Sequence, residues 1–133
     1  HGVGAYLGVH EGPHRIAKRS ADVPFQAGMI VSNEPGYYKE GAYGIRIENL
    51  EVVRAAPLNQ DGDDCRQMLE FEALTLAPID LALIDASIIT AKEIDWLNGY
   101  HARVRSTISP LVDDKTADWL ERATQPLSSA TSS

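Results

Sequence analysis

The stretch MIVSNEPGYYKEGAYGIRIENLEVV, residues 29–53, carries the alternation of apolar and polar residues that decides the fold. The apolar run Met29-Ile30-Val31 predicts a short strand, and Pro35-Gly36 predicts a turn soon after it. The strand therefore delivers Glu34 to its end, just before the turn. Side chains that carry chemistry are often found at such positions, because a rigid element holds them beside a loop.

Residues 44–53 predict a second strand whose first half alternates strictly. Ile45 and Ile47 would share one face, while Arg46 and Glu48 would share the other. Two opposite charges are therefore expected side by side. Alternation alone is equally typical of a strand with one solvated face, so this pattern by itself leaves both readings open.

The remaining segments extend this sheet and then turn helical. The glycine-punctuated residues 1–11 and the apolar residues 68–78 predict strands, with a polar loop at 57–66 between the later strands. Thr90 to Glu93 fits a capping box, and apolar residues at helical spacing continue the helix to about residue 109, before Pro110. A second helix is expected at 114–124. The fold class expected is α+β, mostly antiparallel sheet followed by helices.

Composition narrows the class of partner. The 133 residues carry a net charge of −7, which argues against a nucleic-acid or anionic-membrane surface, since either needs clustered Lys and Arg. No apolar run reaches the roughly 18 residues of a membrane span. The single cysteine, Cys65, makes an internal disulfide impossible and favours a cytoplasmic location. Because the chain begins at His1 rather than Met, we expect a piece of a longer protein.

Four polar side chains stand in otherwise apolar, strand-like surroundings: His1, His10, Glu34 and Glu48. An imidazole or carboxylate on a buried strand face is costly unless it is paired or bound to a metal. Two carboxylates with imidazoles suit Mn, Zn, Co or Fe. The other histidines, including His101, are more typical of ordinary helix-face or loop residues, and we assign them no role.

One short motif matches a known pattern without the local structure that the pattern requires. Residues 10–14 read His-Glu-Gly-Pro-His and match the H-E-x-x-H pattern of zinc metalloproteases. That pattern requires a helix, on which the two histidines share a face. Gly12 and Pro13 would interrupt the helical turn, so we reject this interpretation.

Four motifs follow one another along the chain: His1-Gly-Val-Gly, Val9-His10-Glu11-Gly12-Pro13, Glu34-Pro35-Gly36-Tyr37-Tyr38 and Gly44-Ile45-Arg46-Ile47-Glu48-Asn49. Together they resemble the C-terminal half of aminopeptidase P, a member of the pita-bread metallopeptidases. The resemblance covers nearly the whole chain, including the tail, and implies a catalytic-domain portion at residues 1–80 and a C-terminal helical extension at 81–133.

The resemblance implies that His1, Glu34 and Glu48 are metal ligands, with Glu48 bridging two divalent ions and Glu34 also acting as general base. Manganese is the ion expected, with zinc or cobalt as alternatives. Paired ions can lower the pKa of water and stabilise a developing negative charge. The family's two remaining ligands, a pair of aspartates, would lie upstream. This chain alone is therefore expected to retain metal weakly and to be inactive.

The same resemblance implies that His10 binds the substrate and the tetrahedral intermediate, while Tyr38 and Arg46 brace the metal-site and product-binding groups. The substrates implied are peptides with proline in second position, hydrolysed after the N-terminal residue. A cytoplasmic homodimer is implied for the complete protein.

Two other functions stay open at this stage. A prolidase-like dipeptidase of the same fold would prefer Xaa-Pro dipeptides, although the gap between His1 and His10 is longer than expected for prolidase. A non-catalytic pita-bread protein would serve as a binding module, and such proteins typically have substituted ligands. The helical extension, with Trp96 and Trp119, could also support subunit contacts or packing within the chain.

Overall fold

A computed structural model describes residues 1–6, 9–19, 22–57 and 67–128. Nearly all of the loop expected at 57–66, with Cys65, lies outside the described residues. The chain forms two compact units, His1–Thr75 and Leu76–Ser133. Antiparallel strands make up the first unit and helices the second, which is the expected α+β class.

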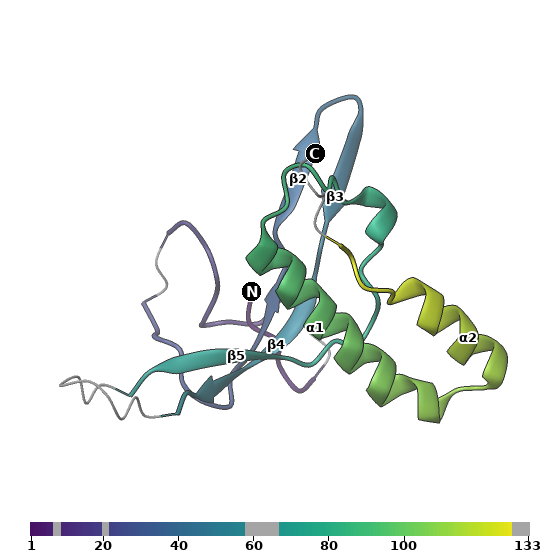
Figure 1. Cartoon of the computed structure of the whole chain (residues 1–133). Coiled ribbons are helices and arrows are strands. Elements are labelled where there is room, and N and C mark those ends of the chain that lie inside the picture. The colour runs from purple at the N-terminus through teal and green to yellow at the C-terminus, as the bar shows by residue number, and fades with distance from the viewer. Residues whose placement is uncertain (7–8, 20–21, 58–66, 129–133) are drawn as a thin grey trace. The chain divides into compact units, whose positions relative to one another are not determined.

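A three-stranded antiparallel sheet is the centre of the first unit (Figure 1). Its strands are β1 (Ile30–Asn33), β4 (Asn49–Ala55) and β5 (Leu69–Ala73), in the order β1-β4-β5. Val31 on β1 and Val53 on β4 are almost completely buried and form the centre of this unit's core. Burying an aliphatic side chain of this size contributes about 1.5–3 kcal/mol to stability.

A two-stranded hairpin extends from the same two chain segments. It pairs β2 (Gly36–Lys39) with β3 (Tyr43–Arg46), and Figure 1 shows it as a projecting ribbon. Gly41 in its turn has φ of 68°, a left-handed conformation that glycine adopts without steric cost. Every residue of both strands is exposed.

The prediction of a single strand at residues 44–53 is wrong in one respect. The segment forms two strands, β3 and β4, with a break at Ile47 and Glu48. Opposite this break lies Pro35, which has no backbone N–H to donate to the ladder. Pro35 still accepts a hydrogen bond from the Ile47 N–H, at 3.3 Å. The register is the same on both sides, with Asn33 opposite Asn49 and Gly36 opposite Arg46. Glu34 therefore lies opposite Glu48.

The N-terminal segment is less regular than expected. In place of the strand anticipated at residues 1–11, its described residues form only isolated bridges, from Gly2 to Glu11 and from Gly2 to Val31. Hydrogen bonds from the Val3 N–H to the Ile30 carbonyl and from the Ser32 N–H to the His1 carbonyl hold it against β1. The strand expected at 68–78 is also shorter, because β5 ends at Ala73.

Two helices dominate the second unit, α1 (Ala91–Ile108) and α2 (Asp114–Ala123), each with a single-turn 3-10 helix before it, η1 (Leu81–Leu83) and η2 (Ser109–Leu111). The predicted capping box is confirmed. The Thr90 hydroxyl accepts from the Glu93 N–H while the Glu93 carboxylate accepts from the Thr90 N–H. The Thr90 hydroxyl also donates to the Glu93 carboxylate at 2.7 Å, and this bond, followed by the one from the Thr90 N–H, lowers the pKa of Glu93.

Helix α1 anchors the segments on either side of it. The Tyr100 hydroxyl donates to the Ala77 carbonyl at 2.9 Å, and Asn98 exchanges two hydrogen bonds with the backbone of Leu127. Arg105 donates to both oxygen atoms of Thr124 at 3.0 and 3.2 Å. The core between these contacts is apolar and contains Ile94, Leu97, Val104 and Leu120.

His101 occupies the middle of this core and is fully buried. Its Nε2 accepts a hydrogen bond from the Ile79 N–H at 3.0 Å, so the proton of the neutral ring is on Nδ1. Burial, and then the charge of Arg105, lower the pKa of His101. The imidazole therefore accepts a hydrogen bond within the core, and burial favours its neutral form.

Protonation of His101 is expected to destabilise the chain. Because its pKa is lowered in the folded state, the unfolded chain binds the proton first as the pH falls below the ordinary value of 6.5. Stability present above that pH is then lost, with a slope of up to about 1.4 kcal/mol per pH unit for one proton. Denaturant unfolding across this range should show a flatter slope in His101→Gln, which keeps an acceptor but does not titrate. Equal slopes would contradict the prediction.

Candidate metal centre

The candidate site lies in the first unit, where the hydrogen-bond ladder between the paired strands is interrupted. His1 lies beside β1 through its carbonyl hydrogen bond with Ser32, and Glu34 follows the last residue of β1. Arg46 is the last residue of β3, and Glu48 directly precedes β4. Strand pairing therefore brings together side chains that are far apart in the sequence.

Three of the predicted residues form a tight cluster. His1, His10 and Glu34 each offer a nitrogen or carboxylate oxygen, and these atoms all lie within 4.8 Å of one another. The His1 and His10 rings have centroids 4.3 Å apart. His1 and Glu34 are partly buried and His10 is exposed, so the cluster is open to ligands on the His10 side.

The hydrogen bonds of His1 define its tautomer. Nδ1 lies 2.8 Å from the Gly2 carbonyl oxygen, which can only accept, so Nδ1 carries a proton. Nε2 lies 3.1 Å from Glu34 Oε1. Two such acceptor atoms repel each other unless a proton or a metal cation lies between them, so the pair is a candidate site for either. A backbone carbonyl that fixes the second ring nitrogen is also the usual support of a metal-bound histidine.

Arg46 braces Glu34 from the other side. Its guanidinium forms an ion pair with Glu34 Oε2, and its Nε donates to the Tyr38 hydroxyl at 2.8 Å. The interactions with Tyr38 and then the charge of Glu34 raise the pKa of Arg46, and Glu48 adds a smaller effect in the same direction. Arg46 was expected beside Glu48, but the ion pair that it forms is with Glu34, so Glu34, Arg46 and Tyr38 are connected by direct contacts.

Glu48 lies at the same break but is not part of the cluster around His1. Its Oε1 accepts a hydrogen bond from the Ser32 hydroxyl at 2.7 Å. The unbroken register places it opposite Glu34, and its charge acts on Arg46. The structure therefore brings His10 closer to His1 and Glu34 than the resemblance implied, and holds Glu48 beside them through Ser32.

Two supporting residues were not identified from the sequence. Ser32 is 1% exposed and fixes Glu48; its alternation with Val31 gave no sign that it turns toward a carboxylate. His14, to which no role was assigned, is buried, and its Nε2 lies 2.8 Å from the Ile30 carbonyl oxygen. Its ring also packs edge-on against Phe25. His14 therefore supports the segment that carries His10.

A cavity of about 390 Å³ opens beside the cluster. His1 and His10 contribute to its wall, together with the segment from Glu11 to Arg15 and with Asp22 and Val23. Pockets of a few hundred Å³ accommodate small molecules and short peptide segments. The same segment contains the H-E-x-x-H string, and the structure has no helix there.

The donor set fits a divalent metal. Two imidazole nitrogens and a carboxylate oxygen are borderline and hard ligands, preferred by Zn, Mn, Co and Fe. His1 Nε2 lies 3.1 Å from a Glu34 oxygen, and the second carboxylate, Glu48, lies directly across the ladder. Imidazole and carboxylate groups gathered beside interrupted antiparallel strands place the chain among α+β proteins with a candidate metal centre.

Two family models match consecutive parts of the chain. The model described as metallopeptidase family M24 matches residues 1–55, and the model described as the C-terminal region of peptidase M24 matches residues 67–127. The chain belongs to metallopeptidase family M24.

The curated relatives that match the chain include aminopeptidases P. Aminopeptidase P1 of Lotus japonicus is 45% identical over 128 residues, which cover 96% of this chain and 19% of the relative. Aminopeptidase P2 of Arabidopsis thaliana is 51% identical over 130 residues, with 96% and 18% covered. The chain therefore spans about a fifth of the length of the curated relatives it matches.

A solved structure shows the same fold. The X-prolyl aminopeptidase of Caenorhabditis elegans, described as a cytosolic enzyme with a di-nuclear active site, matches with a TM-score of 0.82 and 37% identity. The match covers 96% of this chain and 21% of that one. The expected resemblance to the C-terminal part of aminopeptidase P and the expected pita-bread fold are confirmed. None of the described helices is long and apolar enough to span a membrane.

Close packing behind His1 makes Gly2 sensitive to substitution. An added Cβ would lie 2.4 Å from the Glu11 carbonyl oxygen and 2.9 Å from the His14 ring. We expect Gly2→Ala to lower the free energy of unfolding by about 1–3 kcal/mol, as overpacking does.

Gly99→Ala is the matched control, because nothing lies within 4 Å of its Cβ position. In helix α1 this change should be neutral or should stabilise by up to about 1 kcal/mol. Urea denaturation of both variants measures the difference. If Gly2→Ala is as stable as wild type, the packing described behind His1 is wrong.

Proposed function

We propose that this chain is part of a metal-dependent aminopeptidase that removes the N-terminal residue from peptides with proline in second position. The observation that carries the proposal is the cluster of His1, His10 and Glu34, in which His1 Nε2 lies 3.1 Å from a carboxylate oxygen of Glu34. Family membership and the similarity to aminopeptidase P relatives give the reaction class.

The ligands proposed within this chain are His1, Glu34 and Glu48, with two aspartates supplied from outside it, as the resemblance implies. The strand pairing that sets Glu34 opposite Glu48 supports two carboxylates acting on one pair of ions. Two divalent ions, manganese in our proposal with zinc or cobalt as alternatives, would polarise the peptide carbonyl and lower the pKa of water. The di-nuclear site described for the nematode enzyme supports the number of ions.

The chain's own side chains would carry the proton transfers and the orientation. Glu34, held by Arg46 at Oε2, would accept a proton from the attacking water and deliver it to the leaving nitrogen. Arg46 and the Tyr38 hydroxyl would keep that carboxylate in one orientation. The cavity beside His1 and His10 supports a peptide held with its scissile bond at the cluster.

His10 has two candidate roles. As a substrate-binding residue it would donate an N–H to the peptide carbonyl or to the tetrahedral intermediate. As a metal ligand it would use the nitrogen that lies within 4.8 Å of the His1 and Glu34 donor atoms. We propose the first role, because His10 is exposed on the open side of the cluster while His1 and Glu34 are partly buried.

The remaining proposals concern the complete protein. We assign residues 1–80 to the catalytic domain and 81–133 to a helical extension, and we propose a cytoplasmic homodimer. The cytosolic description of the nematode enzyme supports the location. A prolidase-like dipeptidase is the alternative, and preference for Xaa-Pro dipeptides over Xaa-Pro-Xaa tripeptides in the complete enzyme would favour it.

Glu34→Gln tests the catalytic assignment in a complete enzyme that contains these residues. Loss of the base should lower kcat on an Xaa-Pro-Xaa tripeptide by at least about 100-fold, because general base catalysis contributes at least that much. Glu40→Gln in the exposed β2–β3 turn removes the same charge and should leave kcat unchanged. Activity of Glu34→Gln equal to that of Glu40→Gln would refute the assignment.

Metal retention by the 133-residue chain tests the division of the site. With three of the five implied ligands, the chain should hold less than one ion after gel filtration, measured by elemental analysis. In a Co²⁺ titration, His1→Ala should weaken binding by about tenfold or more, since a lost ligand costs at least as much as a lost supporting contact. Two tightly held ions per chain would contradict the proposal.

A further inference from the structure

One face of the β2–β3 hairpin combines two glycines with two large side chains. Strand pairing places Gly36 opposite Arg46 and Tyr38 opposite Gly44. Because side chains alternate along a strand and opposite residues share a face, these four residues lie on the same face of the hairpin. That face therefore has two positions without a side chain beside one tyrosine and one arginine.

The Tyr38 ring occupies the space above both glycines. A Cβ added at Gly44 would lie 2.7 Å from Tyr38 Cδ1 and 3.0 Å from its Cε1. A Cβ added at Gly36 would lie 2.7 Å from the Tyr38 hydroxyl oxygen and 2.8 Å from its Cε2. Carbon atoms in contact are normally about 3.5–4.0 Å apart, so a methyl group at either position would displace the ring.

The backbone gives no other reason for glycine at these two positions. Among the described glycines, those with positive φ are Gly28 and Gly41, so Gly36 and Gly44 have backbone angles that other residues also adopt. Glycine within a strand usually lowers stability, because it has more backbone freedom to lose and no side chain to pack. What Gly36 and Gly44 contribute is therefore the room for the Tyr38 ring.

Tyr38 in this position restrains Arg46. Its hydroxyl accepts from Arg46 Nε at 2.8 Å, and the guanidinium carbon lies 5.8 Å from the ring centroid, within cation–π distance. The same guanidinium forms the ion pair with Glu34. The Arg46 side chain is 48% exposed, and an exposed ion pair contributes little unless its geometry is fixed. The contacts with Tyr38 fix that geometry.

We propose that Gly36 and Gly44 are positioning residues for Glu34 and act through Tyr38 and Arg46. The absence of a side chain at both glycines lets the Tyr38 ring lie where its hydroxyl meets Arg46, and Arg46 then holds the Glu34 carboxylate in one orientation. A methyl group at either glycine keeps every polar group but moves the ring that aligns them. The effect on catalysis rests on the proposed function of Glu34, whereas the effect on Arg46 does not.

NMR of the 133-residue chain tests the arrangement without catalysis. An aromatic ring above a glycine shifts its Hα signals upfield, so Gly44→Ala should remove that shift at Gly36. The Arg46 Nε–H should also exchange with water about tenfold faster, as in Tyr38→Phe, because each change removes a hydrogen bond to a charged donor. Arg46 exchange that is unchanged in Gly44→Ala and accelerated in Tyr38→Phe would overturn the proposal.

Kinetics of a complete enzyme that contains these residues test the consequence for Glu34. Gly44→Ala should lower kcat on an Xaa-Pro-Xaa tripeptide by about tenfold, the effect of losing one charged hydrogen bond. KM should change less, because neither Tyr38 nor Arg46 lines the cavity beside His1. The double variant Gly44→Ala with Tyr38→Phe should be no slower than Tyr38→Phe alone, since both changes remove the same contact. Effects that multiply would contradict the proposal.

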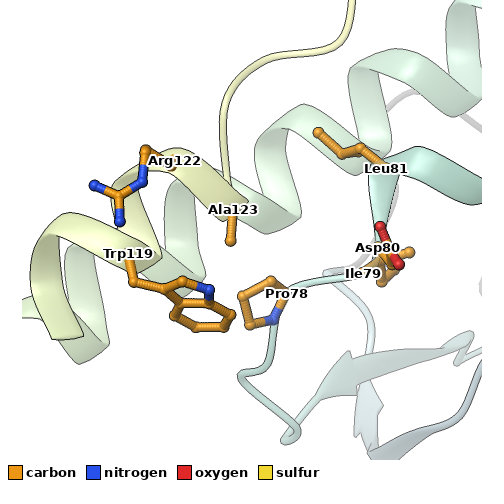
Figure 2. Close-up of a pocket in the computed structure, with 7 residues that line it drawn as sticks. All are labelled: Pro78, Ile79, Asp80, Leu81, Trp119, Arg122 and Ala123. Carbon is orange, nitrogen blue, oxygen red and sulfur yellow. The ribbon is translucent and has the colours of Figure 1, made fainter.

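Controls separate the effect from general destabilisation. Tyr37→Phe removes a hydroxyl from the other face of β2, and Gly99→Ala adds a methyl group where nothing lies within 4 Å. Both should keep the wild-type kcat. The chain's tryptophans lie in the second unit, where Figure 2 shows the Trp119 indole turned toward Pro78, so their fluorescence should be the same in every hairpin variant.

Gly36→Ala is the second, independent variant. It displaces the hydroxyl end of the Tyr38 ring and should reproduce both effects of Gly44→Ala. Normal kcat in a glycine variant whose Arg46 exchange is accelerated would refute the positioning role. If Glu34→Gln is fully active while Arg46 exchange responds as expected, the proposed function fails and the glycines still position Arg46.

Discussion

The antiparallel pairing of β1 with β4 is the constraint on which the candidate site depends. It buries Val31 and Val53, and its register continues past Pro35 into the β2–β3 hairpin. Because opposite residues in an antiparallel pair lie side by side, the interruption leaves Glu34 and Glu48 facing one another without a regular ladder around them. The same strand, β1, holds His1 through Ser32. One register thus positions three of the proposed ligands.

The break in the ladder has an electrostatic consequence. Two carboxylates at one point of a small, acidic chain repel each other, and Arg46 together with the Ser32 hydroxyl offsets part of that repulsion. The Arg46 ion pair is with Oε2 of Glu34, while Oε1 lies 3.1 Å from His1 Nε2. Oε1 and His1 Nε2 are therefore two neighbouring donor atoms to which a cation can bind.

Much of this could be predicted from the sequence, and the failures share a physical cause. The capping box at Thr90, the α1 and α2 boundaries and the α+β class follow from local rules, and the structure confirms them. The break at Glu48 could not be foreseen from alternation, because it is set by Pro35 on the partner strand. Ser32 was missed for the same reason, since its role depends on a residue 16 positions away.

His14 and His101, to which no role was assigned, differ from His1 in what surrounds the imidazole ring. His14 and His101 are both buried, and each has one ring nitrogen against the backbone, at Ile30 and at Ile79. His1 also uses one nitrogen on the backbone, but its second nitrogen faces a carboxylate instead of the apolar core. The sequence separates His1 from His14, which follows Pro13 and precedes Arg15, but it does not say what the second ring nitrogen faces. The difference is the electrostatic environment of the second nitrogen, and only the fold determines it.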